Sequence, residues 1–118
     1  MRKLIQEVER LMKDYPYNSQ SEKNSEDVVI PVKLFDIWSS INWWLSEYDP
    51  VHKVAFWYVT GFVQDEWWSI SLEELESLEM NIEIVNIWKS ETIPRIELDK
   101  FHRPTKFRNL PFKVDDSD

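Results

Sequence analysis

Apolar side chains recur at helical spacing near the start of the chain. Leu4, Ile5, Val8, Leu11 and Met12 share one face of a helix, and charged side chains occupy the opposite face. The pattern predicts an amphipathic first helix that packs on the body of the domain.

The composition changes over residues 15–27, which are rich in Tyr, Pro, Asn, Ser, Gln and Glu. Residues of these types form turns and remain solvated. We therefore expect a polar loop, mobile around residues 20–25.

Segments rich in β-branched and aromatic residues follow the loop and predict strands. They are residues 28–35, 41–48, 52–63 and 66–70. The Asp49-Pro50 pair predicts a turn between two of these segments, so the middle of the chain is expected to be an antiparallel meander. Pro31 has no amide hydrogen, which predicts an edge position or a bulge. Gly61, the only glycine, predicts a bend or a bulge.

The second half of the chain combines one helix with short extended pieces. Ser71-Leu72-Glu73-Glu74 fits the capping box, and a short helix is predicted over 72–78. Residues 82–88 alternate with the period of a strand. This order of elements predicts a single α+β domain, 1–118, in which a curved, mainly antiparallel sheet closes toward a small β-barrel and carries the N-terminal helix.

Composition narrows the class of protein. A chain of 118 residues has the size of one domain, and the absence of cysteine excludes disulfides, thiolate metal sites and cysteine nucleophiles. The longest uncharged stretch, 54–64, is too short to cross a bilayer, and residues 1–13 contain no apolar core of a signal peptide. We expect a cytoplasmic protein without a membrane partner.

Residues for catalysis or metal binding are sparse. His52 and His102 lie fifty residues apart, and neither has a second imidazole or thiol at ligand spacing. One glycine cannot build a phosphate-binding loop. Several carboxylates near strand ends could form an acid–base pair, but solvated turn residues are the better interpretation; they are Glu47, Asp49, Asp65 and Glu66. The sequence predicts a protein without enzymatic activity, metal or cofactor.

Seven tryptophans in 118 residues are unusual, and four of them form the pairs Trp43-Trp44 and Trp67-Trp68. Adjacent strand residues point to opposite faces, so each pair places one indole outward unless the sheet is buried on both sides. Outward indoles would form a surface for stacking bases or for a protein partner. Alternatively, they complete a second small core under the N-terminal helix or the C-terminal segment. The other three, Trp38, Trp57 and Trp88, are expected in the core.

The net charge of −8 repels polyanions on average, so a nucleic-acid site must be local. Residues 1–94 carry −9, residues 95–114 carry +4, and residues 115–118 carry −3. Basic and aromatic residues interleave in the 95–114 segment, as in proteins that bind single-stranded or looped RNA. The candidate RNA-binding residues are Arg95, Lys100, Phe101, Arg103, Lys106, Phe107, Arg108 and Lys113. Alternatively, these cations pair with the acidic body of the domain.

The order of several short motifs resembles a widespread bacterial family of domains of unknown function that plasmids and other mobile elements carry. The motifs lie at 15–20, 32–35, 43–50, 69–76 and 96–99, with Gly61 and Pro104-Thr105. The chain departs from the family in two places. The family usually has a Leu-Gly-Tyr-Phe-type stretch where this chain has residues 66–70, and it usually has arginine at the position of Leu98. In length and general pattern it is also similar to small cytoplasmic regulators of pheromone-responsive conjugative plasmids in Gram-positive bacteria.

The resemblance implies a PUA-like β-barrel without catalysis that binds RNA and restrains expression of a toxic conjugation or surface-adhesin gene. A rival from another class is an acidic protein-binding module, such as an anti-defence or antitoxin-like inhibitor of a basic partner. The net charge favours the rival, whereas the basic segment and the resemblance favour RNA.

Overall fold

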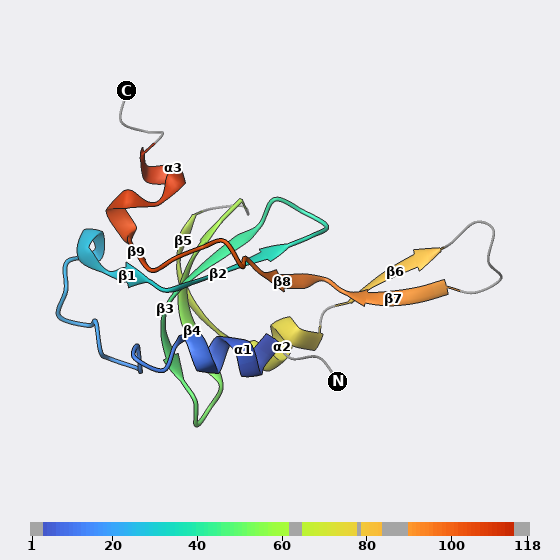
Figure 1. The fold of residues 1–118 in the computed structure, drawn as a ribbon, viewed down its shortest axis with the longest axis horizontal. Coiled ribbons are helices and arrows are strands. Elements are labelled where there is room, and N and C mark those ends of the chain that lie inside the picture. Colours follow the sequence, from blue (N-terminus) through green and yellow to red (C-terminus); the bar gives the residue numbers. More distant parts are fainter. Residues whose placement is uncertain (1–3, 62–64, 78, 84–89, 115–118) are drawn as a thin grey trace.

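The computed structural model describes residues 4–61, 65–77, 79–83 and 90–114 (Figure 1). The helices are α1 (Leu4–Leu11), η1 (Ser25–Asp27, a 3-10 helix), α2 (Leu72–Ser77), η2 (Phe107–Asn109, a 3-10 helix) and α3 (Pro111–Val114). The strands are β1 (Val29–Ile30), β2 (Val32–Asp36), β3 (Asn42–Asp49), β4 (Val54–Thr60), β5 (Glu66–Ser71), β6 (Glu79–Glu83), β7 (Ser90–Pro94), β8 (Ile96–Leu98) and β9 (Thr105–Lys106). None of the described helices is long and apolar enough to span a bilayer.

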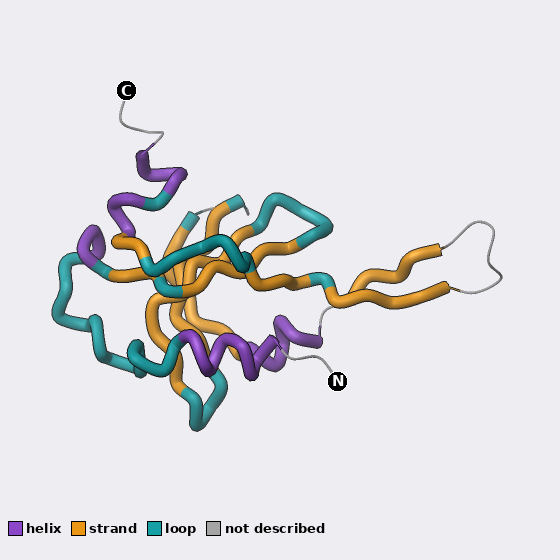
Figure 2. Tube along the Cα trace, in the orientation of Figure 1, coloured by secondary structure: helices purple, strands orange, loops and turns teal. Residues whose placement is uncertain are grey.

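Five strands form one antiparallel sheet in the order β5-β4-β3-β2-β8 (Figure 2). The middle of this sheet is the predicted meander, and a β-bulge between Leu45 and Glu47 interrupts the β3–β4 register. The described strands do not form the closed barrel that the sequence predicts, because β5 and the three-residue β8 remain separate edges. The fold is therefore α+β with an open, mainly antiparallel sheet and an N-terminal helix.

Pro31 divides the strand predicted over 28–35 into two strands. Since proline cannot donate a ladder hydrogen bond, β1 leaves the main sheet and pairs with β9, while β2 pairs with β3 and β8. A third sheet consists of β6 and β7 and extends away from the body (Figure 1). Of the strand predicted over 82–88, the structure shows the beginning in β6, and residues 84–89 lie outside the described part.

Helix α1 covers one face of the main sheet, as its amphipathic pattern predicts. Leu4, Val8 and Met12 are buried in the larger core, and Ile5 and Leu11 pack against its margin. The neighbouring helix α2 adds Leu72 and Leu75 to the same core; those two side chains are fully or nearly fully buried.

A second core covers the other face of the sheet. Trp44 lies there with Phe107, Leu110, Ile30 of β1 and Val28, which directly precedes β1. The sheet is thus buried on both sides at β3, so Trp43 and Trp44 are both buried, on opposite faces. This arrangement matches the alternative of a second small core under the C-terminal segment.

The three tryptophans expected in the core differ in position. Trp57 is buried and lies 5.9 Å from Trp43 between ring centroids. Trp38 is 65% exposed, so its core prediction is wrong: β2 ends at Asp36, and Trp38 belongs to the following turn. Trp88 lies outside the described residues.

The loop over 15–27 is held at Gln20, which is 5% exposed. Its Nε2 donates to the carbonyl oxygens of Val29 (2.8 Å) and Ser46 (2.9 Å), and its Oε1 accepts from the amide of Val29 (2.7 Å). The expectation of a mobile, solvated segment is therefore wrong at Gln20, because these hydrogen bonds satisfy its amide group in the interior.

Ser71 precedes α2, and its Oγ accepts a hydrogen bond from the amide of Glu73 at 3.2 Å. Loss of such a cap costs about 0.5–2 kcal/mol, so Ser71→Ala should lower the free energy of unfolding by that amount in urea titrations. Ser69→Ala, an exposed serine on β5, is the matched control and should change the free energy of unfolding by less than about 0.5 kcal/mol. Equal stabilities of the two variants would rule out the cap.

Candidate nucleic-acid interface

Three of the predicted RNA-binding cations pair with acidic side chains of the domain. Arg95 Nη2 lies 2.8 Å from Asp36 Oδ2, and Lys113 Nζ lies 3.1 Å from Glu26 Oε1. Arg108 donates to Asp27. These pairs agree with the alternative that cations of the segment neutralise the acidic body.

The Arg95–Asp36 pair is the most enclosed of the three, because the Asp36 side chain is almost fully buried. Burial alone would raise the pKa of Asp36, but hydrogen bonds from Arg95, the Trp38 amide and the Ser39 hydroxyl outweigh it and lower the pKa below its usual value. Arg95 is therefore a structural residue that closes the β2–β3 turn.

Phe107 does not face solvent, so it cannot stack a base. Helix η2 turns the ring into the second core, where it is 4% exposed and lies 4.8 Å from Tyr58 and 5.0 Å from Trp67 between ring centroids. Phe101, in contrast, is 91% exposed. Of the two phenylalanines predicted as stacking residues, only Phe101 is accessible.

The accessible candidates lie in residues 99–106, which comprise the connection after β8 and the short strand β9; we call this segment the 99–106 turn. Lys100, Arg103 and Lys106 are exposed, and among the described residues none of them forms a salt bridge. Arg103 donates to the carbonyl oxygens of Lys100 (3.0 Å) and His102 (3.3 Å) within the turn. The turn thus carries three unpaired cations and one exposed aromatic ring.

Asp99 shapes this turn. Its Oδ1 accepts from the amide of Phe101 (2.9 Å), and its Oδ2 lies 3.3 Å from Lys33 Nζ on β2. Burial would raise the pKa of Asp99, but these hydrogen bonds and Lys33 lower it. The ionised carboxylate therefore fixes the backbone that places Phe101 outward.

His102 anchors the turn from the inside. Its Nε2 lies 2.7 Å from the carbonyl oxygen of Ile30, and its ring meets Trp44 edge-on at 5.9 Å. A neutral ring that carries its proton on Nε2 satisfies this contact, because a carbonyl oxygen accepts.

The burial of His102 predicts a pH dependence of stability. Burial lowers its pKa, although the Ile30 carbonyl and Asp99 oppose the shift, whereas the unfolded side chain titrates near 6.5. Between these pKa values the unfolded state binds more protons, so the free energy of unfolding should fall as the pH drops below about 6.5. In urea titrations between about pH 5 and pH 7.5, the free energy of unfolding of His102→Gln should change less with pH than that of the parent. An identical pH dependence in the variant would assign the effect to another group.

An open groove of about 530 Å³ lies between the 99–106 turn and the β2–β3 loop. Its lining includes Lys33, Ser39, Asn42, Lys100 and Phe101. A second groove, of about 350 Å³, lies on the α1 side of the turn and is lined in part by Arg10, His102 and Arg103. The turn therefore separates two grooves, each of which has basic residues in its wall.

Sequence reasoning missed Lys33 and Arg10. Lys33 reaches the turn because β2 pairs with β8, and Arg10 reaches it from α1. Neither contact has a sequence signal, because both join segments more than sixty residues apart.

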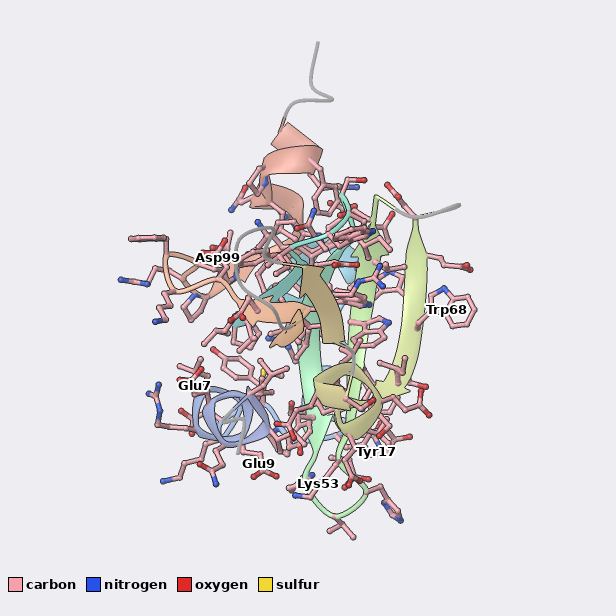
Figure 3. All side chains as sticks on the ribbon, turned by 90° about the vertical axis from the view of Figure 1, so that its right-hand side faces the viewer. Glu7, Glu9, Tyr17, Lys53, Trp68 and Asp99 are labelled. Carbon is pink, nitrogen blue, oxygen red and sulfur yellow. The ribbon has the colours of Figure 1, made fainter. Side chains whose placement is uncertain are left out.

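The tryptophans of the candidate stacking or partner surface divide into two groups. Trp43 and Trp44 are buried and cannot contact a partner, which corrects their assignment. Trp67 and Trp68 are exposed on β5, at the opposite edge of the sheet from β8. Figure 3 shows Trp68 on β5 and Asp99 on opposite sides of the molecule.

Two of the carboxylates considered for acid–base chemistry make structural contacts. Glu47 accepts the amides of Asn18 (2.8 Å) and Gln20 (2.9 Å), and Asp49 lies 2.8 Å from His52 Nδ1 in the β3–β4 turn. The described residues contain no group of three side chains suited to a metal ion.

Comparisons of the chain with protein-family models, curated proteins and solved structures give no match.

Proposed function

We propose that this chain is a non-enzymatic RNA-binding regulator whose binding site is the 99–106 turn with its two grooves. The observation that carries the proposal is the exposure of Phe101 between Lys100 and Arg103, two cations that have no acidic partner among the described residues. An exposed ring can stack an unpaired base, and adjacent cations can hold the flanking phosphates.

The local charge makes this assignment compatible with an acidic protein. The 99–106 turn contains three bases and one acid, in a chain of net charge −8. Asp99 is already paired with Lys33, so it opposes a phosphate less than a free carboxylate would. Binding would be local, and its affinity would fall only modestly with salt, because it rests on few phosphate contacts.

The family resemblance supports the regulatory part of the proposal. In length and pattern the chain resembles PrgU, a small regulator that conjugative plasmids encode, and such a role means restraint of a toxic conjugation or surface-adhesin gene. The resemblance also implies a PUA-like fold. We include that fold in the proposal in an open form, because the sheet does not close between β5 and β8.

The test measures binding of a fluorescent ten-nucleotide oligouridine at several salt concentrations. Joint replacement of Lys100, Arg103 and Lys106 by alanine should reduce the magnitude of the salt slope by about 2, because single strands lose about 0.7 per phosphate contact. Phe101→Ala should weaken binding by about 1–3 kcal/mol with the slope unchanged.

Two exposed residues outside the site provide matched controls. Lys13→Ala removes a cation in the turn that follows α1, and Val51→Ala truncates an apolar side chain in the β3–β4 turn. Both should bind RNA as the parent does. If the triple variant folds and keeps the parental salt slope, the site lies elsewhere; if the parent binds no RNA at low salt, the acidic protein-binding module replaces this proposal.

A further inference from the structure

The edge strand β5 is the second exposed feature of the fold, and the RNA proposal does not use it. In the main sheet β5 pairs only with β4, so its other side presents backbone amides and carbonyls with no strand beside them among the described residues. Unpaired edges of this kind are templates for an additional strand. We call residues 65–74, which contain β5 and the start of α2, the β5 edge.

Two indoles lie on opposite faces of the β5 edge. Trp67 rests against Tyr58 (5.2 Å) and Phe107 (5.0 Å) on the face of the second core, yet it remains 41% exposed. Trp68 pairs with Trp57 across the strands and is 55% exposed, and it projects from β5 in Figure 3. A strand added at this edge would have an indole on each side.

The charge of the β5 edge indicates which kind of additional strand would bind there. Residues 65–74 contain four acids and no base: Asp65, Glu66, Glu73 and Glu74. Within the described ranges none of these carboxylates takes part in a salt bridge. Acidic groups beside exposed indoles favour lysine or arginine, which can pair with the carboxylates and lie over the rings.

The same charges disfavour a second copy of this chain. A two-fold axis perpendicular to the sheet would pair two β5 strands antiparallel and place Asp65 and Glu66 of one copy near Glu73 and Glu74 of the other. Like charges placed opposite each other destabilise a strand pair. RNA is disfavoured for the same reason, because its phosphates are anionic.

We propose that the β5 edge binds an extended, lysine- or arginine-bearing segment of a protein partner as an additional strand of the sheet. This site is independent of the proposed RNA site, because β5 and β8 are opposite edges of the same sheet. Four strand spacings separate them by about 19 Å. A regulator could thus hold RNA at one edge and a basic protein segment at the other.

The probe is a capped ten-residue peptide of alternating lysine and threonine, and its affinity is measured by calorimetry with the full chain. The comparison peptide alternates lysine and proline, so it has the same charge but lacks half of the amide donors. We expect the lysine–threonine peptide to bind about tenfold tighter or better. Equal affinities would show simple charge attraction and would overturn the proposal.

Variants then locate the peptide. Trp68→Ala and the double change Glu73→Gln, Glu74→Gln should each weaken peptide binding about tenfold. Trp38→Ala is the matched control, since it removes an exposed indole in the β2–β3 turn, and it should leave peptide affinity unchanged. Equal losses in Trp38→Ala and Trp68→Ala would overturn the assignment to β5.

Hydrogen exchange distinguishes strand addition from side-chain contact. Amides of 66–71 that point away from β4 should exchange more slowly when the lysine–threonine peptide is bound. Unchanged exchange at these amides with bound peptide would overturn strand addition. Trp68→Ala should leave oligouridine binding unchanged, and weaker oligouridine binding in this variant would place RNA at the β5 edge, against this proposal. Loss of RNA binding by the parent alone would refute only the proposed function.

Discussion

Replacement of Gly61 by alanine should lower the free energy of unfolding by at least about 2 kcal/mol. Gly61 has φ of +82°, a left-handed conformation that costs an L residue about 1–2 kcal/mol. A Cβ at this position would lie 2.0 Å from the carbonyl oxygen of Ser40 and 2.7 Å from its carbonyl carbon. Because both atoms belong to the backbone, the β2–β3 loop would have to move, and overpacking of this kind costs about 1–3 kcal/mol.

Urea denaturation followed by tryptophan fluorescence measures this effect. Ser40→Ala is the control, because it removes only the hydrogen bond from Ser40 Oγ to the Gly61 carbonyl (3.3 Å) and leaves both backbones in place. We expect Ser40→Ala to change the free energy of unfolding by less than about 0.5 kcal/mol, because Ser40 is exposed. A Gly61→Ala protein that unfolds at the parental urea concentration would contradict the close approach of the two loops.

The sequence predicts the local elements of this fold because each has a period or a cap. The apolar positions of α1 repeat at helical spacing, and Ser71 stands where α2 begins. The meander follows from four runs of strand-forming residues and the Asp49-Pro50 turn. Closure of the sheet was a different kind of prediction, since it depends on which strands meet across the fold, and no local pattern encodes that.

The candidate site was predictable only as a segment. Interleaved basic and aromatic residues identify 95–114. Whether each of these residues is exposed and unpaired, however, depends on residues far away in the sequence. Asp36 lies fifty-nine residues from Arg95 and neutralises it, and the second core takes Phe107. Composition reports how many cations a segment has, whereas only the fold shows which of them remain unpaired.

The composition of the polar loop over 15–27 likewise does not show which residues the loop contacts. Its polar composition predicts a solvated segment, yet η1 within it supplies Glu26 and Asp27 to Lys113 and Arg108. The loop therefore keeps two of the predicted RNA-binding cations occupied. The buried amide group of Gln20 and the carboxylate of Glu47 hold the loop from the inside.

Replacement of Gln20 by leucine should lower the free energy of unfolding by about 3 kcal/mol. Leucine has a similar volume, so it fills the site but leaves the Val29 amide and the carbonyl oxygens of Val29 and Ser46 without their present partner. Each buried polar group that loses its partner costs about 1–3 kcal/mol. Gln6→Leu makes the same change at an exposed position of α1, and it should alter the free energy of unfolding by less than about 0.5 kcal/mol.

A second measurement reports on the loop itself. Release of the loop raises the population of locally open states, so trypsin should cleave after Lys23 faster in Gln20→Leu than in the parent under native conditions. The Gln6→Leu protein should be cleaved there at the parental rate. If Gln20→Leu keeps the parental stability and the parental cleavage rate, the buried amide does not hold the loop, and Glu47, which accepts the amides of Asn18 and Gln20, would be the residue that does.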